Sequence, residues 1–291
     1  MTKKIVKNKK IDTVILMHRY HVGANIVLNK IVTDPNINIK ALIIKDVWSS
    51  KKHFTGHNML FSFYRFGRKI GFYCLLGFIL ISVLHFIPLI IFDLLFLGVV
   101  YKSRNFLKTS ESLAKFYNIP VHIVSDINDK ESTRLLKSLK PDVILSNNYG
   151  QIIKDHIINI PKIACINLHP GILPTYKGLM PHFWNMVNKD TEGGVTLHLI
   201  DEGVDTGRII LMDKITIEKG TSYYKHWFNL AILGSKLLKK YFKSLRQGKS
   251  LNTKIQYSKD KIFHLPFPTS SAFIRFKQNG YKLFKFSDFF K

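Results

Sequence analysis

The sequence predicts an α/β fold in which a parallel sheet is flanked by helices. Short apolar runs bounded by turn residues are typical of buried strands, and they alternate with segments whose apolar residues recur at helical spacing. The hydrophobic fraction of 46% and the charged fraction of 22% are ordinary for a folded protein of 291 residues. We therefore expect a Rossmann-like parallel sheet flanked by helices, with an apolar helical insertion and a short basic C-terminal extension.

The first three elements set the pattern. Residues 12–17 (DTVILM) are typical of a buried strand, residues 22–33 carry apolar side chains at helical spacing, and residues 38–45 (NIKALIIK) form a second strand-like run. Strand, helix and strand in this order are typical of a parallel sheet. The same pattern returns later in the chain, and the expected strands there are 120–125, 142–146, 163–168, 194–200 and 208–216, with helices over 129–139 and 222–245.

An apolar run interrupts this pattern. Residues 70–101 contain no Lys or Arg, and Asp93 is the only charged residue. A run of this length is a candidate membrane helix, but strands of one sheet lie on both sides of it, so a single crossing would divide the sheet. Because Pro88 breaks a helix, we expect two short arms, 70–87 and 89–101, in a shallow hairpin at a membrane surface. The alternative is a buried helix pair at a dimer interface.

The charge balance is strongly basic. Forty-four Lys and Arg against nineteen Asp and Glu give a net charge of +25, which attracts nucleic acid, anionic lipid or phosphorylated metabolites. The alternative is a solvated basic surface without a role in anion binding. Cys74 and Cys165 lack the spacing of a disulfide framework or a zinc site, so we expect no metal and a reducing compartment. The basic start of the chain is followed by too short an apolar run for a signal peptide, which favours the cytoplasm.

The residues that carry chemistry lie between 166 and 207. Asn167 and His169 are two apart at the end of an expected strand, so both side chains face one cleft beyond the carboxyl edge of the sheet. A second strand, with His198, ends in an acidic, Gly-rich loop that carries Asp205. This loop can present a carboxylate to the same cleft.

An amide, an imidazole and a carboxylate together suit acyl transfer. The Asn167 amide can donate to an oxygen that becomes negative in a tetrahedral intermediate. His169 can move a proton, and Asp205 can orient it and raise its pKa. No Ser or Cys stands in a nucleophile-elbow setting, which favours direct attack by the acceptor over an acyl-enzyme.

Four elements in order carry a resemblance to a known family: Asn167-Leu168-His169-Pro170, Leu173-Pro174-Thr175-Tyr176-Lys177-Gly178, His198 and Asp205-Thr206-Gly207. At these residues the chain resembles the folate-dependent formyltransferases, which include the glycinamide-ribonucleotide, methionyl-tRNA and nucleotide-amino-sugar enzymes. The resemblance covers roughly residues 120–245. The first third departs from the family pattern because it carries the apolar insertion.

The resemblance implies a donor, N10-formyltetrahydrofolate, and a catalytic triad of Asn167, His169 and Asp205. Residues 146–161 resemble the loop that holds the pterin ring, and the implied folate-binding residues are Asn148, Tyr149, Gly150, Ile152 and Asp201. The implied acceptor-binding residues are Arg19, His21, Tyr176, Lys177 and His198. Two alternatives stay open, namely that Arg19 and His21 are surface residues and that His198 is structural. His182, Phe183 and Trp184 either line the acceptor pocket or pack inside a helix.

Several acceptors remain possible. An amino sugar or another small amine of envelope synthesis, anionic or lipid-linked, fits the basic surface and the insertion. Charged initiator tRNA also fits +25, but the resembling enzymes carry a β-barrel after the catalytic domain, and the last 45 residues do not show five strands. Hydrolysis of formyltetrahydrofolate is a third function, although the small regulatory domain of such enzymes is not evident. A non-catalytic, membrane-tethered scaffold is the remaining possibility.

The expected organisation follows from these assignments. Residues 1–245 form the catalytic domain with an insertion at 54–108, and residues 246–291 form the basic extension. We expect the protein in the cytoplasm, peripheral or monotopic at the inner face of the membrane through 70–101.

Overall fold

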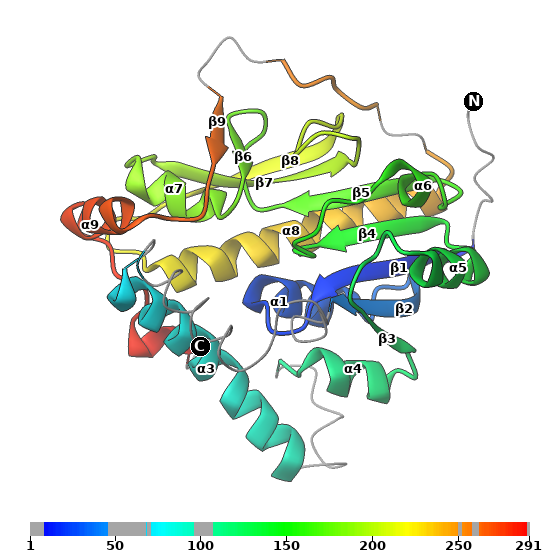
Figure 1. Cartoon of the computed structure of the whole chain (residues 1–291), viewed down its shortest axis with the longest axis horizontal. Helices are drawn as coiled ribbons and strands as arrows, with labels where there is room; N and C mark the ends of the chain where they lie inside the picture. The colour runs from blue at the N-terminus through cyan, green and yellow to red at the C-terminus, as the bar shows by residue number, and fades with distance from the viewer. Residues whose placement is uncertain are drawn as a thin grey trace.

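A computed structural model describes residues 9–45, 68, 71–95, 107–249, 252–257 and 262–289. Its centre is a seven-stranded sheet in the order β3-β2-β1-β4-β5-β7-β8 (Figure 1). The strands are β1 Ile11–His18, β2 Ile37–Lys45, β3 Val121–Val124, β4 Val143–Asn147, β5 Ala164–His169, β7 Glu192–Leu199 and β8 Ile209–Thr216. A second, two-stranded sheet pairs β6 Tyr176–Gly178 with β9 Phe263–Leu265.

Helices cover both faces of the large sheet. They are α1 Val22–Ile31, α3 Phe72–Leu95, α4 Ser110–Phe116, α5 Lys130–Leu139, α6 Asp155–Ile158, α7 Pro181–Val187, α8 Tyr223–Arg246 and α9 Ser270–Gln278, followed by a 3₁₀ turn, η2 Phe286–Phe289. Side chains alternate along β1: Ile15 and Met17 pack with α1 and α8, whereas Val14 and Leu16 pack with α5 and α6. This alternation produces two apolar layers, one on each face of the sheet.

All seven expected strands of the large sheet are confirmed, but the expectation of a wholly parallel sheet is wrong. Strands β1 to β5 pair in parallel, whereas β7 is antiparallel to both β5 and β8. The physical reason lies in the connection. Residues 200–208 join β7 to β8 directly, and a parallel pair needs a crossover of a dozen or more residues. The sheet is therefore mixed, with its antiparallel part next to β5.

The apolar insertion contains one continuous helix, α3, with Pro88 inside it. The predicted bend at Pro88 is wrong. Packing against the body on both sides of the proline, by Phe86 before it and Leu89 after it, holds the two parts in line despite the missing backbone donor. The second arm of the predicted hairpin extends to residue 101 and so falls partly outside the described residues. Within the described part of the chain, no helix combines the length and the hydrophobicity that a membrane crossing requires.

A buried polar contact fixes α3 to the body. The Nδ1 atom of His85 lies 2.9 Å from the Tyr224 hydroxyl on α8, and its Nε2 atom lies 3.2 Å from Oδ1 of Asn25 on α1. Around it, Ile81 and Phe86 are buried in the same core as α1 and α8. Because both ring nitrogens have partners on different helices, the contact specifies where along α1 and α8 the insertion packs.

Four histidines, His21, His85, His182 and His226, lie where α1, α3, α7 and α8 meet, and the last three are buried. His21 caps α1 by accepting from the Ala24 backbone N–H at 3.2 Å, and His182 stacks on Tyr223. Burial lowers the pKa of His85 and of His226 to about 4 and that of His21 to about 3, and it holds the pKa of His182 well below its ordinary value. These side chains are therefore neutral in the folded protein at pH 7.

Replacing His85 by Leu should destabilise the fold. The change keeps an apolar side chain of similar size but leaves Asn25 and Tyr224 without their shared partner, so we expect the free energy of unfolding to fall by about 2 kcal/mol. Urea denaturation followed by circular dichroism measures it. Val83→Leu, on the exposed side of the same helix, is the matched control and should leave stability unchanged. Equal stability of the two variants would show that the polar contact does not hold α3.

Acidification should destabilise the protein through these histidines. Their pKa values are depressed in the folded state, so the unfolded chain binds more protons, and stability is lost as pH falls from about 6.5 toward 4. At pH 5, a group whose pKa is about 4 when folded and about 6.5 when unfolded contributes a loss of about 2 kcal/mol. Urea unfolding measured from pH 7.5 to 5 tests this, and His85→Leu should have a shallower pH dependence. An identical pH dependence in that variant would contradict the assignment.

Candidate active site

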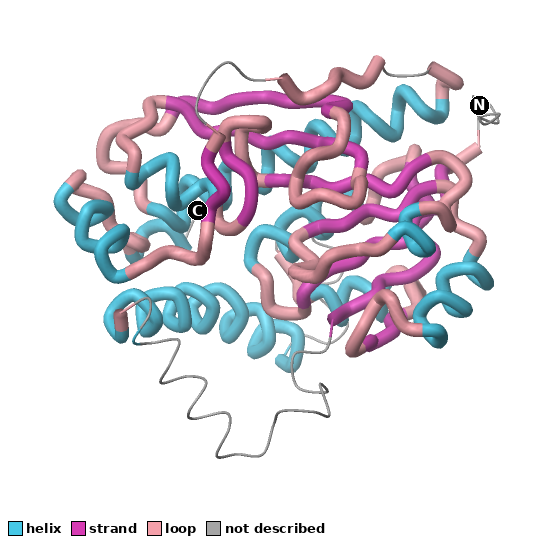
Figure 2. The backbone as a smooth tube through the Cα atoms, turned by 45° about the horizontal axis from the view of Figure 1, so that its top comes forward, coloured by secondary structure: helices cyan, strands magenta, loops and turns pink. Residues whose placement is uncertain are grey.

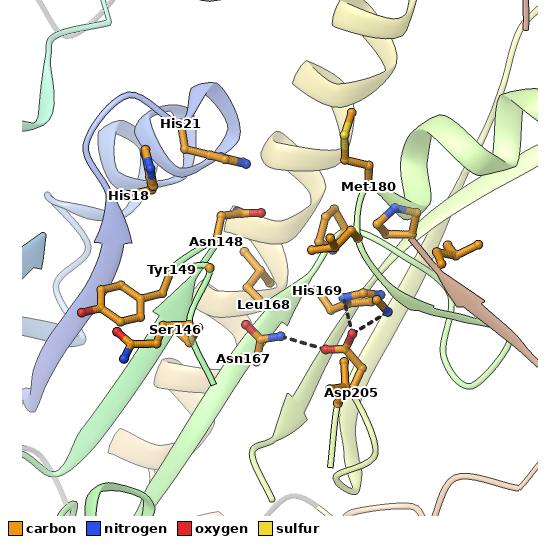
Figure 3. Close-up of a pocket in the computed structure, with 18 of the residues that line it drawn as sticks. His18, His21, Ser146, Asn148, Tyr149, Asn167, Leu168, His169, Met180 and Asp205 are labelled. Atoms are coloured by element: carbon orange, nitrogen blue, oxygen red, sulfur yellow. Dashed lines mark hydrogen bonds and ion pairs between the residues drawn. The ribbon is translucent and has the colours of Figure 1, made fainter. Parts of the chain in front are cut away.

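A cavity of about 730 Å³ lies at the carboxyl edge of the parallel strands. His18 at the end of β1, Asn148 just after β4, and His169 at the end of β5 all line it (Figure 3). Open α/β sheets bind their ligands at this edge because the strand ends and the loops that follow them converge there. The two polar residues of β5, Asn167 and His169, therefore face this cavity.

The Asp205 carboxylate is the centre of the site. Its Oδ1 atom is 3.4 Å from the Asn167 amide nitrogen and 3.5 Å from Nε2 of His198. Its Oδ2 atom is 3.5 Å from Nδ1 of His169 and accepts the backbone N–H of Gly178 at 2.8 Å. Figure 3 shows Asn167 and His169 pointing toward this carboxylate from the neighbouring strand. The three residues of the expected triad are thus brought together.

Strand register and loop geometry produce this convergence. In the antiparallel pairing of β5 with β7, Asn167 lies directly opposite His198, and the Asn167 amide nitrogen is 3.1 Å from Nε2 of that histidine. The loop after β7 holds Asp205 in a left-handed conformation, with φ of 53°, which costs energy in a non-glycine residue and is found most often at functional sites. Gln256 fastens the loop by donating to the carbonyl oxygens of Asp205 and Gly207.

Gly178 must be glycine at this position. Its φ is 96°, and a Cβ atom there would lie 2.6 Å from the Leu265 carbonyl oxygen on β9. Only glycine adopts this conformation with β9 so close. The Leu-Pro-x-x-x-Gly element therefore delivers a backbone N–H to the Asp205 carboxylate.

The electrostatics favour a charged Asp205. Burial opposes its ionisation, but His169, His198 and the Gly178 N–H outweigh burial and hold the pKa of Asp205 far below its usual range. For His169 the balance is reversed. Burial lowers its pKa, and the attraction of Asp205 only partly offsets this.

His169 is held at both ring nitrogens. Its Nε2 atom is 2.8 Å from the Tyr176 carbonyl oxygen, to which it donates, while Nδ1 faces Asp205. A proton gained at Nδ1 during a reaction would therefore meet a carboxylate, which stabilises the charged ring. His169 can take up and return a proton without changing its position, as a general acid–base group must.

The five residues expected on the folate side all line the cavity: Asn148, Tyr149, Gly150, Ile152 and Asp201. Asn148 and Gly150 both have positive φ angles, of 55° and 73°, so the chain turns sharply at the mouth after β4. Asp201 does not point freely into solvent, because its Oδ1 atom accepts from the Thr206 hydroxyl at 2.6 Å and thereby shapes the Asp205 loop.

The residues expected on the acceptor side divide into two groups. His21 and His198 line the cavity, whereas Arg19, Tyr176 and Lys177 do not. The Arg19 Nε atom forms an ion pair with Glu111 at 2.7 Å. The Tyr176 hydroxyl donates to Asp190 at 2.5 Å, and its ring stacks on Phe263. The Lys177 side chain is buried. The contribution of Tyr176 to the site is its backbone carbonyl, which sequence patterns do not show.

The end of the cavity where the acceptor is expected has walls of aromatic and histidine side chains that sequence reasoning largely missed. His182, whose position the sequence leaves open, lines the cavity, whereas Phe183 and Trp184 are buried in the hydrophobic core. Phe78 and Ser82 of α3 and Tyr223 and Trp227 of α8 complete the wall. Each pair is spaced by four residues, a signal for one helix face, but the same spacing is typical of a core face. Among the described residues, no cluster of His, Cys, Asp and Glu has the arrangement of a metal site.

Comparison with known proteins agrees with the geometry. Residues 112–227 match the family model described as Formyl transferase. A methionyl-tRNA formyltransferase of Pelotomaculum thermopropionicum is 36% identical over 168 residues, which cover 57% of this chain and 53% of the relative. A similar enzyme of Clostridioides difficile is 36% identical over 138 residues, 47% of this chain and 45% of the relative. The chain thus matches about half the length of these relatives.

Solved structures share the fold. Phosphoribosylglycinamide formyltransferase of Anaplasma phagocytophilum has a TM-score of 0.54 and 16% identity, over 88% of this chain and 98% of that one. The N-formyltransferase of Helicobacter canadensis, solved with folinic acid and dTDP-3-aminofucose, has a TM-score of 0.50 and 19% identity, over 88% of this chain and 71% of that one. The matched segment 112–227 contains all four sequence elements, and Asn167, His169 and Asp205 lie close together within it. This part of the chain is similar to the formyl transferase family.

Proposed function

We propose that this protein transfers a formyl group from N10-formyltetrahydrofolate to a primary amine. The observation that carries the proposal is the meeting of Asn167, His169 and Asp205 at one edge of a deep cavity in a chain similar to the formyl transferase family. The cavity volume is that of a site for a ligand of this size. The five residues assigned to the folate line it from the turn after β4 and from the loop after β7.

The residues can divide the reaction between them. The acceptor nitrogen forms a bond to the formyl carbon, and the bond from that carbon to N10 of the folate breaks. Asn167 donates to the formyl oxygen as it becomes negative, exchanging one of its bonds to His198 or Asp205 for this one. His169 carries the proton from the acceptor nitrogen toward N10, and Asp205 stabilises the ring while it is charged.

For the acceptor we propose an amino sugar or another small, anionic amine of envelope synthesis. Tyr223, Trp227 and His182 line the acceptor end, His182 stacks on the other two, and aromatic walls of this kind are typical of sites for small molecules. The Helicobacter canadensis N-formyltransferase, which shares the fold, was solved with an amino sugar of this kind, dTDP-3-aminofucose. The excess of basic residues attracts anionic molecules to the surface. We assign His21 and His198 to the acceptor side of this site.

Charged initiator tRNA is the second candidate. The sequence relatives named above are methionyl-tRNA formyltransferases, and a net charge of +25 suits RNA. The described residues of the C-terminal part form the short strand β9, helix α9 and η2. Hydrolysis to formate, with water as the acceptor, needs the same triad and is separated from both by its product.

We further propose that the reaction takes place in the cytoplasm at the inner face of a membrane, with the enzyme held there through segment 70–101. The support is the hydrophobic character of this segment and the basic residues on both sides of it in the sequence. We assign residues 1–245 to the catalytic domain and 246–291 to the basic extension.

Transfer of labelled formyl groups tests the proposed function. The wild-type protein and His169→Ala are each given formyl-labelled N10-formyltetrahydrofolate and a cell extract, and the label is followed into sugar-nucleotide, lipid, RNA and formate fractions. Wild type should label an amine-containing fraction, with turnover in His169→Ala lower by a factor of about a hundred, since acid–base groups typically contribute this much. Undiminished transfer by His169→Ala would refute the assignment. Label in RNA or formate would promote one of the alternatives.

A further inference from the structure

Helix α3 has two different faces. One face packs on the body through Phe78, Ile81, His85 and Phe86, which follow helical spacing. The opposite face is apolar and exposed, and it also follows helical spacing. Its members, here called the outer stripe, are Leu76, Ile79, Leu80, Val83, Ile87, Ile90 and Ile91. Their exposed fractions run from 38% to 61%, so the stripe is open along its whole length.

The outer stripe is too regular to be a scatter of exposed apolar residues. From Leu76 to Ile91 it extends about 22 Å at the rise of an α-helix. The sequence from Leu75 to Ile91 contains no Asp, Glu, Lys or Arg to interrupt it. A continuous apolar stripe on a surface helix marks a contact with another molecule or with a membrane. Figure 2 shows α3 at the edge of the molecule, outside the layer of strands.

The segment that packs beside α3 indicates which partner this is. Gly77 lies so close to Leu283 that an added Cβ would come within 2.2 Å of its Cδ1 atom, and Gly71 lies against Ser270. Between and just after these contact points the chain displays exposed cations, at Arg275, Lys277, Lys282 and Lys285. Among the described residues of this segment, 262–289, the acidic side chain is Asp288, which already accepts from Ser222 and from the Lys285 backbone.

Exposed cations beside an apolar stripe are the features of a helix that lies in the plane of an anionic membrane. Two exposed apolar side chains of the same basic segment, Ile274 at 56% and Phe286 at 69%, add to this character. A second copy of the chain would bring the same cations together, because the patch would face itself. The charge therefore favours an anionic lipid surface over self-association.

The same helix also lines the acceptor end of the cavity. Phe78 and Ser82, on the inner side of α3, are part of its wall. Tyr20, at the rim, is 51% exposed, and its ring contacts Phe86 of α3 with centroids 5.7 Å apart. A surface that holds the outer stripe would consequently lie next to the acceptor end rather than the folate end, which is built from β4 and the loop after β7.

We propose that the outer stripe and the adjacent basic segment bind α3 flat on an anionic membrane, and that the acceptor is consequently an amine on a membrane-anchored, anionic molecule. The part about the acceptor rests on the proposed formyl transfer, whereas the membrane contact does not. His85 and its two partners hold α3 in the position that both roles need.

Vesicle binding tests the contact. Full-length wild type, the double variant Leu80→Glu/Ile87→Glu and the control Met212→Glu/Ile255→Glu, which changes exposed apolar residues elsewhere, are sedimented with two kinds of vesicle. One is phosphatidylcholine alone and the other is phosphatidylcholine with phosphatidylglycerol. Wild type and control should bind the anionic vesicles. The stripe variant should bind them about tenfold or more weakly, because two carboxylates replace apolar side chains that would enter the membrane surface.

The outcomes separate this inference from the proposed function. Equal binding of wild type and the stripe variant, or no binding of wild type, overturns the membrane contact. Dimerisation of wild type that the stripe variant abolishes also overturns it, in favour of a second copy. Binding of tetrahydrofolate by the stripe variant should equal that of wild type, since neither residue lines the cavity. In the label experiment, transfer into solvent-extracted lipid should be lost in the stripe variant and kept in the control; label confined to molecules in solution overturns the lipid-linked acceptor.

Discussion

The contacts of the Asp205 carboxylate are the interaction on which the rest of the site depends. One carboxylate faces Asn167 and His169 from β5, His198 from β7 and the Gly178 backbone from β6. It therefore connects the large sheet to the small one. Its neighbours His169, His198 and the Gly178 N–H hold the pKa of this largely buried carboxylate low. In turn, its charge partly offsets the effect of burial on the pKa of His169.

The antiparallel strands β7 and β8 bring His198 and Asp205 to the site. The chain passes from β5 through β6 and α7 before it enters β7. Here β7 runs against β5, so His198 is opposite Asn167 in the register. The loop that follows folds back and lines the same cavity as residues near the ends of β1, β4 and β5. Asp205 thus arrives in the cavity in a left-handed conformation that Gln256 and the Gly178 N–H hold in place.

Much of this could be predicted from the sequence, because strand positions depend on local hydrophobic pattern and the Asn-x-His spacing depends on the two-residue repeat of a strand. All seven strands of the large sheet lie where the pattern predicts them, and Asn167, His169 and Asp205 meet as expected. What could not be predicted depends on tertiary packing. The Arg19 side chain forms an ion pair with Glu111, which is distant in the sequence. The Tyr176 hydroxyl donates to Asp190, which lies beyond the next turn and helix. Pro88 is tolerated because the body supports α3 on both sides of it.

The most direct test of the central claim is the rate of formyl transfer by Asp205→Asn. This change keeps the size of the side chain and removes the charge that holds His169 and His198. We predict that turnover with saturating N10-formyltetrahydrofolate falls by a factor of about a hundred or more, as for other preorganised polar groups in acyl transfer, while circular dichroism stays that of wild type. Asp213→Asn, on the exposed side of β8, should keep the full rate. Full-rate transfer by Asp205→Asn would contradict the account.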